Sequence, residues 1–261
     1  DASLEGLVVL DVEGIERSVG AVPLGAMKFA KTGIAAKEEN YHQLMETLLA
    51  KFSERCEAAG VRHMEFEMQG EPAEAILEES NYFDCVVVGL RTFFTYESGA
   101  GKDGEYGTAD DEPGDSLEQI MKTTLAPVFA VPLNWKPDDH FSALIAHNGS
   151  PHSMRALRQF ARLYGRTQVS VSLMHCTDAA DQSPEMLGKS VGFLRAHGFA
   201  NVEARTESGD IRDVMSADYC EPFDLVVLGA HGKSGVVEFF TGSLCKDLIE
   251  RGNKPLLIAN G

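Results

Sequence analysis

A glycine-rich segment around residue 230 has the residue types and spacing of a phosphate-binding site. Gly229, Gly232 and Gly242 are separated by two and nine residues, and Ser243 follows directly. The apolar run 225–228 before them predicts a buried parallel strand, and the pattern after them predicts a helix that begins at Gly242. Glycine permits positive φ and close approach of a ligand, and a helix N-terminus offers free N–H groups and a positive dipole end. This segment therefore predicts a phosphate site.

Two common nucleotide motifs do not fit this segment. In a Walker A sequence the first glycine would stand five residues before Gly232, where this chain has Val227. The spacing also differs from the G-x-G-x-x-G fingerprint of dinucleotide-binding folds.

Composition limits the classes of function. The chain has 261 residues with 44% hydrophobic side chains, which is enough for two domains with cores of their own. Its net charge of -17 argues against nucleic acid or an anionic membrane as a main partner. No run reaches the ~18 apolar residues of a membrane helix, and no secretory signal is expected. The five cysteines form no C-x-x-C pair, which favours a reducing, cytoplasmic location.

The first half predicts alternating strands and helices separated by one long loop. Residues 13–37 contain five glycine and proline residues and predict that loop, with a helical turn within it as an alternative. A helix follows, ends near Gly60, and places four apolar residues on its inward face, namely Tyr41, Leu44, Leu48 and Phe52. Further strands are expected over 7–12, 64–68, 85–89 (buried) and 128–131, further helices over 72–79 and 116–124, and a linker over 133–140.

The same order of elements recurs in the second half. Strands are expected over 143–146, 169–174, 202–206 and 256–259, and helices from Ser150, Ser183 and Gly209. Residues 84–89 match 224–229, and 126–128 match 254–256. This repeat predicts an α/β fold of two tandem open parallel sheets, over 1–134 and 141–261, with ligands at the carboxyl ends of the strands. The first repeat has no counterpart of 143–165, so we expect it to lack its first strand and helix, about thirty residues.

The glycine series and its flanking strands closely resemble the nucleotide-binding signature of the universal stress protein family. The resemblance covers nearly the whole chain as a tandem pair, and it implies a Rossmann-like, adenine nucleotide alpha hydrolase-like fold that binds ATP, with or without Mg²⁺. It also implies the contacts of the nucleotide in the second repeat, at Ala146, His147, Asn148, Cys176, Gly229, His231, Gly232, Gly242, Ser243 and Leu244.

Plainer interpretations of these residues remain open. Asn148 stands where the family has an acidic residue, which removes a charge, and it could be an ordinary turn residue before Gly149. Ser243 could be a simple N-cap, and His231 a solvated loop residue. Gly229 and Gly232 could serve only to make the turn.

The first repeat departs from the signature. Thr92 replaces the second glycine, and Asp115 falls where Ser243 does, so a carboxylate would repel phosphate there. The acidic insertion 97–115 predicts a surface loop. A calcium site is an alternative, although the order of residues is not that of an EF-hand. We expect this repeat to be a degenerate partner of the second.

Three hypotheses for function remain open from the sequence. The first is a nucleotide-dependent stress-response or sensor module with slow or absent turnover, because no carboxylate pair, triad or metal cluster accompanies the loop. The second is a slow ATP hydrolase that uses His231 or Ser243, and the third is a nucleotide-free interaction scaffold. The apolar strands 128–131 and 256–259 are expected to pair within the chain, as a pseudo-dimer of the two repeats that leaves a homodimer open.

Overall fold

The structure is a computed structural model. It describes residues 2–19, 26–90, 117, 120–121, 124–133, 135–136, 141–165, 168–178, 183–215, 217–230 and 243–259. The chain divides into two compact units, one of residues 1–79 with 94–99 and one of residues 80–93 with 100–261. Residues 80–93 and 100–134 belong to the same unit as the second repeat, so the division into units differs from the boundary expected between the repeats.

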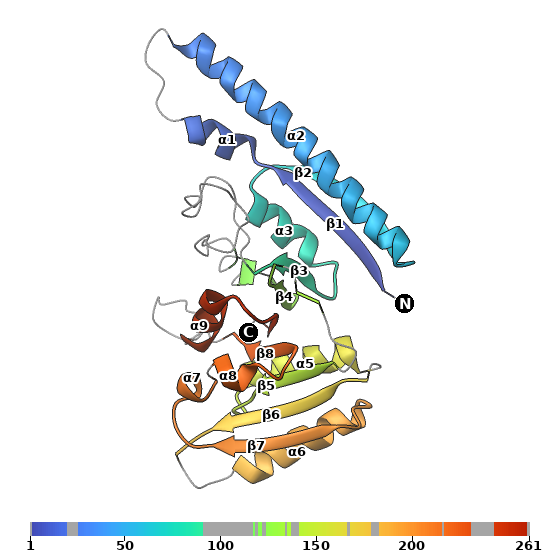
Figure 1. Ribbon diagram of the computed structural model, residues 1–261, viewed down its shortest axis with the longest axis vertical. Helices are drawn as coiled ribbons and strands as arrows, with labels where there is room; N and C mark the ends of the chain where they lie inside the picture. Colours follow the sequence, from blue (N-terminus) through green and yellow to red (C-terminus); the bar gives the residue numbers. More distant parts are fainter. Residues whose placement is uncertain are drawn as a thin grey trace. The chain divides into compact units, whose positions relative to one another are not determined.

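The first unit is a two-stranded parallel sheet with a long helix (Figure 1). Its elements are β1 (Ser3–Leu10), α1 (Val12–Val19), α2 (Met27–Ala58), β2 (Arg62–Gln69) and the start of α3 (Pro72–Ser80). The ring of Phe52 occupies the space beside Gly6, where a Cβ would lie 2.6 Å from its Cδ1. It also meets the His63 ring edge-on, with 5.7 Å between ring centroids. The helix therefore packs on one face of this sheet.

The expectation of a long loop over 13–37 is wrong, because α1 covers the start of this segment and α2 begins at Met27. Asp11 begins α1 by accepting a hydrogen bond from the Gly14 N–H at 2.7 Å. Gly33 lies inside α2 with open space around it, so the helix tolerates it at the ordinary cost of a glycine. Ile34 packs against the small cluster of Leu10, Ile15 and Met45, which extends the apolar face upstream. Residues 20–25 lie outside the described part.

The inward face of α2 is only partly the expected one. Tyr41 and Phe52 pack inward as expected. Leu44 is 50% and Leu48 48% exposed, and Met45, Leu49 and Cys56 are buried instead. Helix α2 ends at Ala58, and Gly60 follows with φ of 66°, as its sequence position predicted.

The second unit is a seven-stranded sheet in the order β3-β4-β9-β8-β5-β6-β7 (Figure 1). The strands are β3 (Val86–Gly89), β4 (Val128–Val131), β5 (Ser142–Ala146), β6 (Ser170–Cys176), β7 (Val202–Glu207), β8 (Leu225–Gly229) and β9 (Leu256–Ala259). All neighbours are parallel except β4 and β9, which pair antiparallel. The expected pairing of strands 128–131 and 256–259 within the chain is therefore confirmed.

The helices of this unit are α5 (Pro151–Tyr164), α6 (Ser183–Ala196), α7 (Ile211–Val214), α8 (Ala217–Cys220) and α9 (Ser243–Arg251). Side chains alternate along each strand, so each strand contributes to both faces. Ala143, Ile145, Val227 and Leu257 share one buried cluster with residues of α5 and α6 such as Phe160. Right-handed crossovers assign α7, α8 and α9 to the opposite face.

The first repeat has no strand in the described residues that corresponds to β5. In the second repeat β5 pairs with β6 on one side and β8 on the other. The corresponding strands of the first repeat fall into two sheets, with β1 paired to β2 and β3 paired to β4. Strand β3 is therefore an edge strand, and the expectation that 85–89 is buried is wrong: Val87 is 61% exposed.

Aromatic side chains connect β4 to the second repeat. Trp135 lies 6.1 Å from Phe129 and 6.4 Å from Phe141, measured between ring centroids, and Phe141 stacks on Tyr164 at 5.6 Å. Burial raises the pKa of the Tyr164 hydroxyl to about 12. Part of the expected linker 133–140 is thus packed, and residues 134 and 137–140 lie outside the described part. So does most of the helix expected over 116–124.

Candidate functional site

The carboxyl ends of β5 and β8 form a topological switch point. From β5 the chain proceeds to β6 and β7, and it then returns to the other side of β5 to form β8. The connection after β5 leads toward β6 and the connection after β8 leads toward β9, in opposite directions, and open α/β sheets bind ligands at the carboxyl edge between two such strands. Ala146, Cys176 and Gly229 end β5, β6 and β8 and therefore lie along this edge.

Gly229 is required by a close approach of backbone. A Cβ at Gly229 would lie 2.5 Å from both the carbonyl carbon and the oxygen of His152, and 2.8 Å from the Ser153 nitrogen. Gly229 is not among the glycines with positive φ in the described part, unlike Gly149, whose φ is 73°. Of the two properties of glycine that the sequence offered, Gly229 uses close approach and not positive φ, and the first turn of α5 is what comes close to it.

The turn after β5 is held by its own side chains. The Ser150 hydroxyl accepts a hydrogen bond from the Ser153 N–H at 3.3 Å and so caps α5, as the sequence predicted. The Asn148 Oδ1 accepts a hydrogen bond from the Ser150 N–H at 3.1 Å. The amide nitrogen of the exposed Asn148 is therefore the atom that can donate a hydrogen bond to a ligand.

His147 is buried and faces α6, with 1% of the residue exposed. The Ser190 hydroxyl donates to the Met186 carbonyl at 3.0 Å, so the His147 Nε2–H donates to Ser190 Oγ at 2.8 Å. Burial, and then the neighbouring His175, lower the pKa of His147 to about 4. This histidine is therefore neutral at neutral pH, and its imidazole anchors the end of β5 to α6.

The end of β6 is tied to the same turn. His175 Nδ1 lies 3.0 Å from the His147 carbonyl oxygen, so this nitrogen donates the hydrogen bond. The next residue, Cys176, is half-buried, and burial followed by Glu207 and Asp210 raises the pKa of its thiol. A thiol with a raised pKa stays protonated, which fits a small packed residue whose backbone is the part available at the edge.

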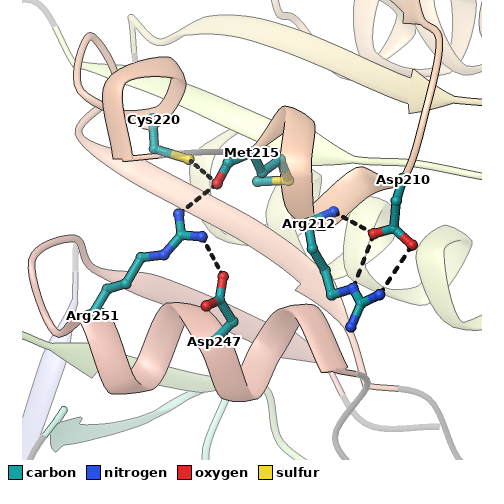
Figure 2. A network of polar contacts seen from close by, with 6 residues as sticks. All are labelled: Asp210, Arg212, Met215, Cys220, Asp247 and Arg251. Carbon is teal, nitrogen blue, oxygen red and sulfur yellow. Dashed lines mark hydrogen bonds and ion pairs between the residues drawn. The ribbon is translucent and has the colours of Figure 1, made fainter.

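Helix α9 begins at Ser243, and its C-terminal end is fastened to the turn between α7 and α8 (Figure 2). The Arg251 guanidinium donates to the Met215 carbonyl oxygen at 2.6 Å and forms an ion pair with Asp247 one turn earlier in α9. Cys220 Sγ lies 3.8 Å from the same carbonyl oxygen. Leu244 is half-buried in the first turn of α9.

The structure brings part of the expected site together. Ala146, His147 and Asn148 form one end of the edge, with Cys176 beside them and Gly229 on the adjacent strand. His231, Gly232 and Gly242 lie outside the described residues. Sequence reasoning missed the contacts of α9. The i,i+4 spacing of Asp247 and Arg251 was the signal that could have identified this pair.

Within the described residues, no group of three or more His, Cys, Asp or Glu side chains is arranged to hold a metal ion. The calcium alternative for 97–115 lies in a segment that is not described. None of the described helices combines the length and apolarity needed to cross a membrane.

Solved universal stress proteins share this architecture. One from Archaeoglobus fulgidus DSM 4304 is 18% identical, with a TM-score of 0.64 over 99% of this chain and 87% of that chain. A putative universal stress protein from Pseudomonas aeruginosa UCBPP-PA14 is 11% identical, with a TM-score of 0.56 over 99% of this chain and 92% of that chain. A universal stress protein in complex with cAMP, 19% identical, matches 47% of this chain and 98% of its own at a TM-score of 0.41. The sequence matches no protein-family model and no curated protein.

The fold and its mostly parallel sheet place the chain among Rossmann-like α/β proteins. More closely, it has the fold of the universal stress proteins in an arrangement that spans two repeats.

Proposed function

We propose that this chain binds ATP or a related adenine nucleotide in its second repeat and works as a nucleotide-dependent stress-response or sensor module in the cytoplasm. The observation that carries the proposal is the switch point between the carboxyl ends of β5 and β8, the edge where open α/β sheets bind their ligands. The glycine series that begins at Gly229 leaves this edge and leads to the start of α9 at Ser243. Universal stress proteins share the fold, and one of them has been solved with cAMP.

In this proposal the nucleotide lies along the edge with its phosphates toward α9. Ala146 and Asn148 on β5, with the backbone of Cys176 on β6, would meet the base and ribose. His147 would contribute by holding the end of β5 against α6. The phosphate oxygens would accept hydrogen bonds from backbone N–H groups of the loop and of the α9 N-terminus. These groups would come from Gly229, His231, Gly232, Gly242, Ser243 and Leu244.

A nucleotide-free interaction scaffold is the second candidate, and one contact favours it. The Asn148 Oδ1 is used by the Ser150 N–H, and no carboxylate stands at that position to accept from a ribose hydroxyl. In that case the fold of the second repeat would persist without a ligand, and the chain would work through its surfaces.

The test is a calorimetric titration of ATP, with and without Mg²⁺, into the wild-type chain and into Ser243→Asp. Aspartate is a good cap for a helix N-terminus, so α9 should keep its stability. The same carboxylate would repel a phosphate, so we expect at least about a tenfold loss of ATP affinity in the variant, equal to ~1.4 kcal/mol. Equal ATP binding by both proteins would contradict the proposed phosphate position. No binding by the wild type would favour the scaffold.

A further inference from the structure

Strand β3 ends the seven-stranded sheet and has one free edge. Within the described residues β3 pairs only with β4, whereas its counterpart in the second repeat, β8, lies between β9 and β5. We propose that the free edge of β3 binds a parallel β-strand of a partner protein, in the way that β8 binds β5. This interaction uses a different surface from the nucleotide edge and does not depend on the proposed function.

The paired side of β3 has the same backbone geometry as that of β8. The Val86 N–H donates a hydrogen bond to the Pro127 carbonyl oxygen, just before β4, at 3.0 Å, and the Val226 N–H donates to the Pro255 carbonyl oxygen, just before β9, at 3.0 Å. Successive residues of a parallel strand direct their backbone groups to opposite neighbours. The N–H and C=O of Val87, which follows Val86, therefore point to the free edge, where an added strand would bind them.

The second repeat shows what covers such an edge. Residues 84–89 match 224–229, so Val87 stands where Val227 does. Val227 is opposite Ile145 of β5 and shares a buried cluster with residues of α5. It is 0% exposed, whereas Val87 is 61% exposed. A strand followed by a helix, as β5 is followed by α5, would therefore bury Val87 in the first repeat.

Asp84 marks where the added strand would begin. In the second repeat the Asp224 Oδ2 accepts hydrogen bonds from the Ser142 N–H at 2.8 Å and from the Ser142 hydroxyl at 2.9 Å, which fixes the start of β5. Asp84 has the same position before β3, and its exposed carboxylate forms an ion pair with Arg162. A carboxylate accepts several hydrogen bonds, so Asp84 can bind a strand while this ion pair persists. The partner strand is therefore expected to begin with serine or threonine and to continue with apolar residues.

The two ends of the sheet differ in the side chains that they expose. Strand β7, at the other end, carries an exposed ion pair between Arg205 and Glu203, and charged side chains on an edge strand oppose the addition of further strands. At the β3 end the exposed side chains are apolar: Tyr82 is 82% and Phe83 37% exposed, as well as Val87. An apolar free edge is the surface to which an extended segment adds as a further strand.

The test uses a fluorescent synthetic peptide with the sequence of residues 140–165, which contains β5 and α5, and a scrambled peptide of the same composition. Fluorescence anisotropy should show saturable binding of the first peptide alone to the wild-type chain. Val87→Pro removes the N–H that faces the free edge and keeps the ladder to β4, and Val87→Lys places a charge on that edge. Each variant should bind the peptide at least about tenfold more weakly. Wild-type emission of Trp135 would show that a variant is folded, and Val87→Lys decides the question if proline disrupts β3.

Leu133→Lys is the matched control. Leu133 is 66% exposed and lies outside β3, so this variant makes the same kind of change away from the edge and should keep wild-type affinity for the peptide. The inference would be overturned by a wild-type chain that binds no peptide, or by equal binding in the wild type and in Val87→Lys. A wild-type dimer in sedimentation velocity that becomes a monomer in Val87→Lys would also overturn it, because a second copy of the chain would then occupy the edge.

Discussion

Gly229→Ala should destabilise the second unit even without any ligand. The added Cβ would meet backbone atoms of His152 and Ser153 at 2.5 and 2.8 Å, distances that real Cβ atoms essentially never show. These atoms belong to the first turn of α5, which cannot rotate away as a flexible side chain would. Overpacking of a well-packed site typically costs about 1–3 kcal/mol, and a clash with backbone places this variant in the upper half of that range.

The assay is urea unfolding followed by fluorescence of Trp135, the single tryptophan of the chain. Its indole packs between Phe129 and Phe141, so its emission reports on the second unit. Gly192→Ala in α6 is the control, because a Cβ there meets nothing within 4 Å. Alanine on an open helix surface should stabilise by about 0.5–1 kcal/mol. A Gly229→Ala midpoint equal to the wild-type midpoint would refute the close approach.

Three further variants test the packing and electrostatics of the second repeat. In Asp224→Ala the Ser142 N–H and hydroxyl lose the carboxylate to which they donate hydrogen bonds at 2.8 and 2.9 Å. The free energy of unfolding should fall by about 1–3 kcal/mol in the same urea assay. Phe160→Ala empties a fully buried site between two aromatic rings and should lower stability by about 3–5 kcal/mol, measured as a shift of the urea midpoint. Burial lowers the pKa of His147 to about 4 from 6.5, so the unfolded chain takes up the proton first as the pH falls. The free energy of unfolding is therefore not reduced by His147 above pH 6.5, and it falls by up to about 3 kcal/mol as the pH drops toward 4. In His147→Gln this decrease should be absent from urea titrations across the same pH range.

The second repeat was predictable because its local signals agree with its packing. Short apolar runs became buried strands, and Ser150 caps α5 as its position before Pro151 suggests. Gly198 and Gly252 follow helices with positive φ. Where propensity, periodicity and turn residues point to one structure, sequence reasoning is sufficient.

The first half was harder to predict because tertiary contacts outweigh local composition there. Gly14 and Gly33 favour a loop by composition, but burial of the cluster around Leu10 and Met45 offsets the low helix propensity of these two glycines. The inward face of α2 is fixed by β1 and β2, which the sequence alone does not place. The exposure of Val87 follows from its position on an edge strand, which depends on how the sheet is ordered.

The candidate site was predictable in position and less so in its contacts. The alternation of strands and helices predicts ligands at the carboxyl ends of the strands, and the structure places Asn148 and Gly229 at that edge. The physical reason for Gly229 is contact with α5, which spacing within its own segment does not reveal. The burial of His147 against Ser190 depends on α6, 43 residues away, so no local pattern indicates it.

The most direct test of the central claim is the nucleotide content of the freshly purified chain. The protein would be denatured, and the released small molecules would be identified and quantified by mass spectrometry against the protein concentration. ATP or ADP near one per chain is the predicted result and would support a single site in the second repeat. A protein that releases no nucleotide and takes up no added ATP would contradict the account, and would mean that the turn around Asn148 does not form a nucleotide site.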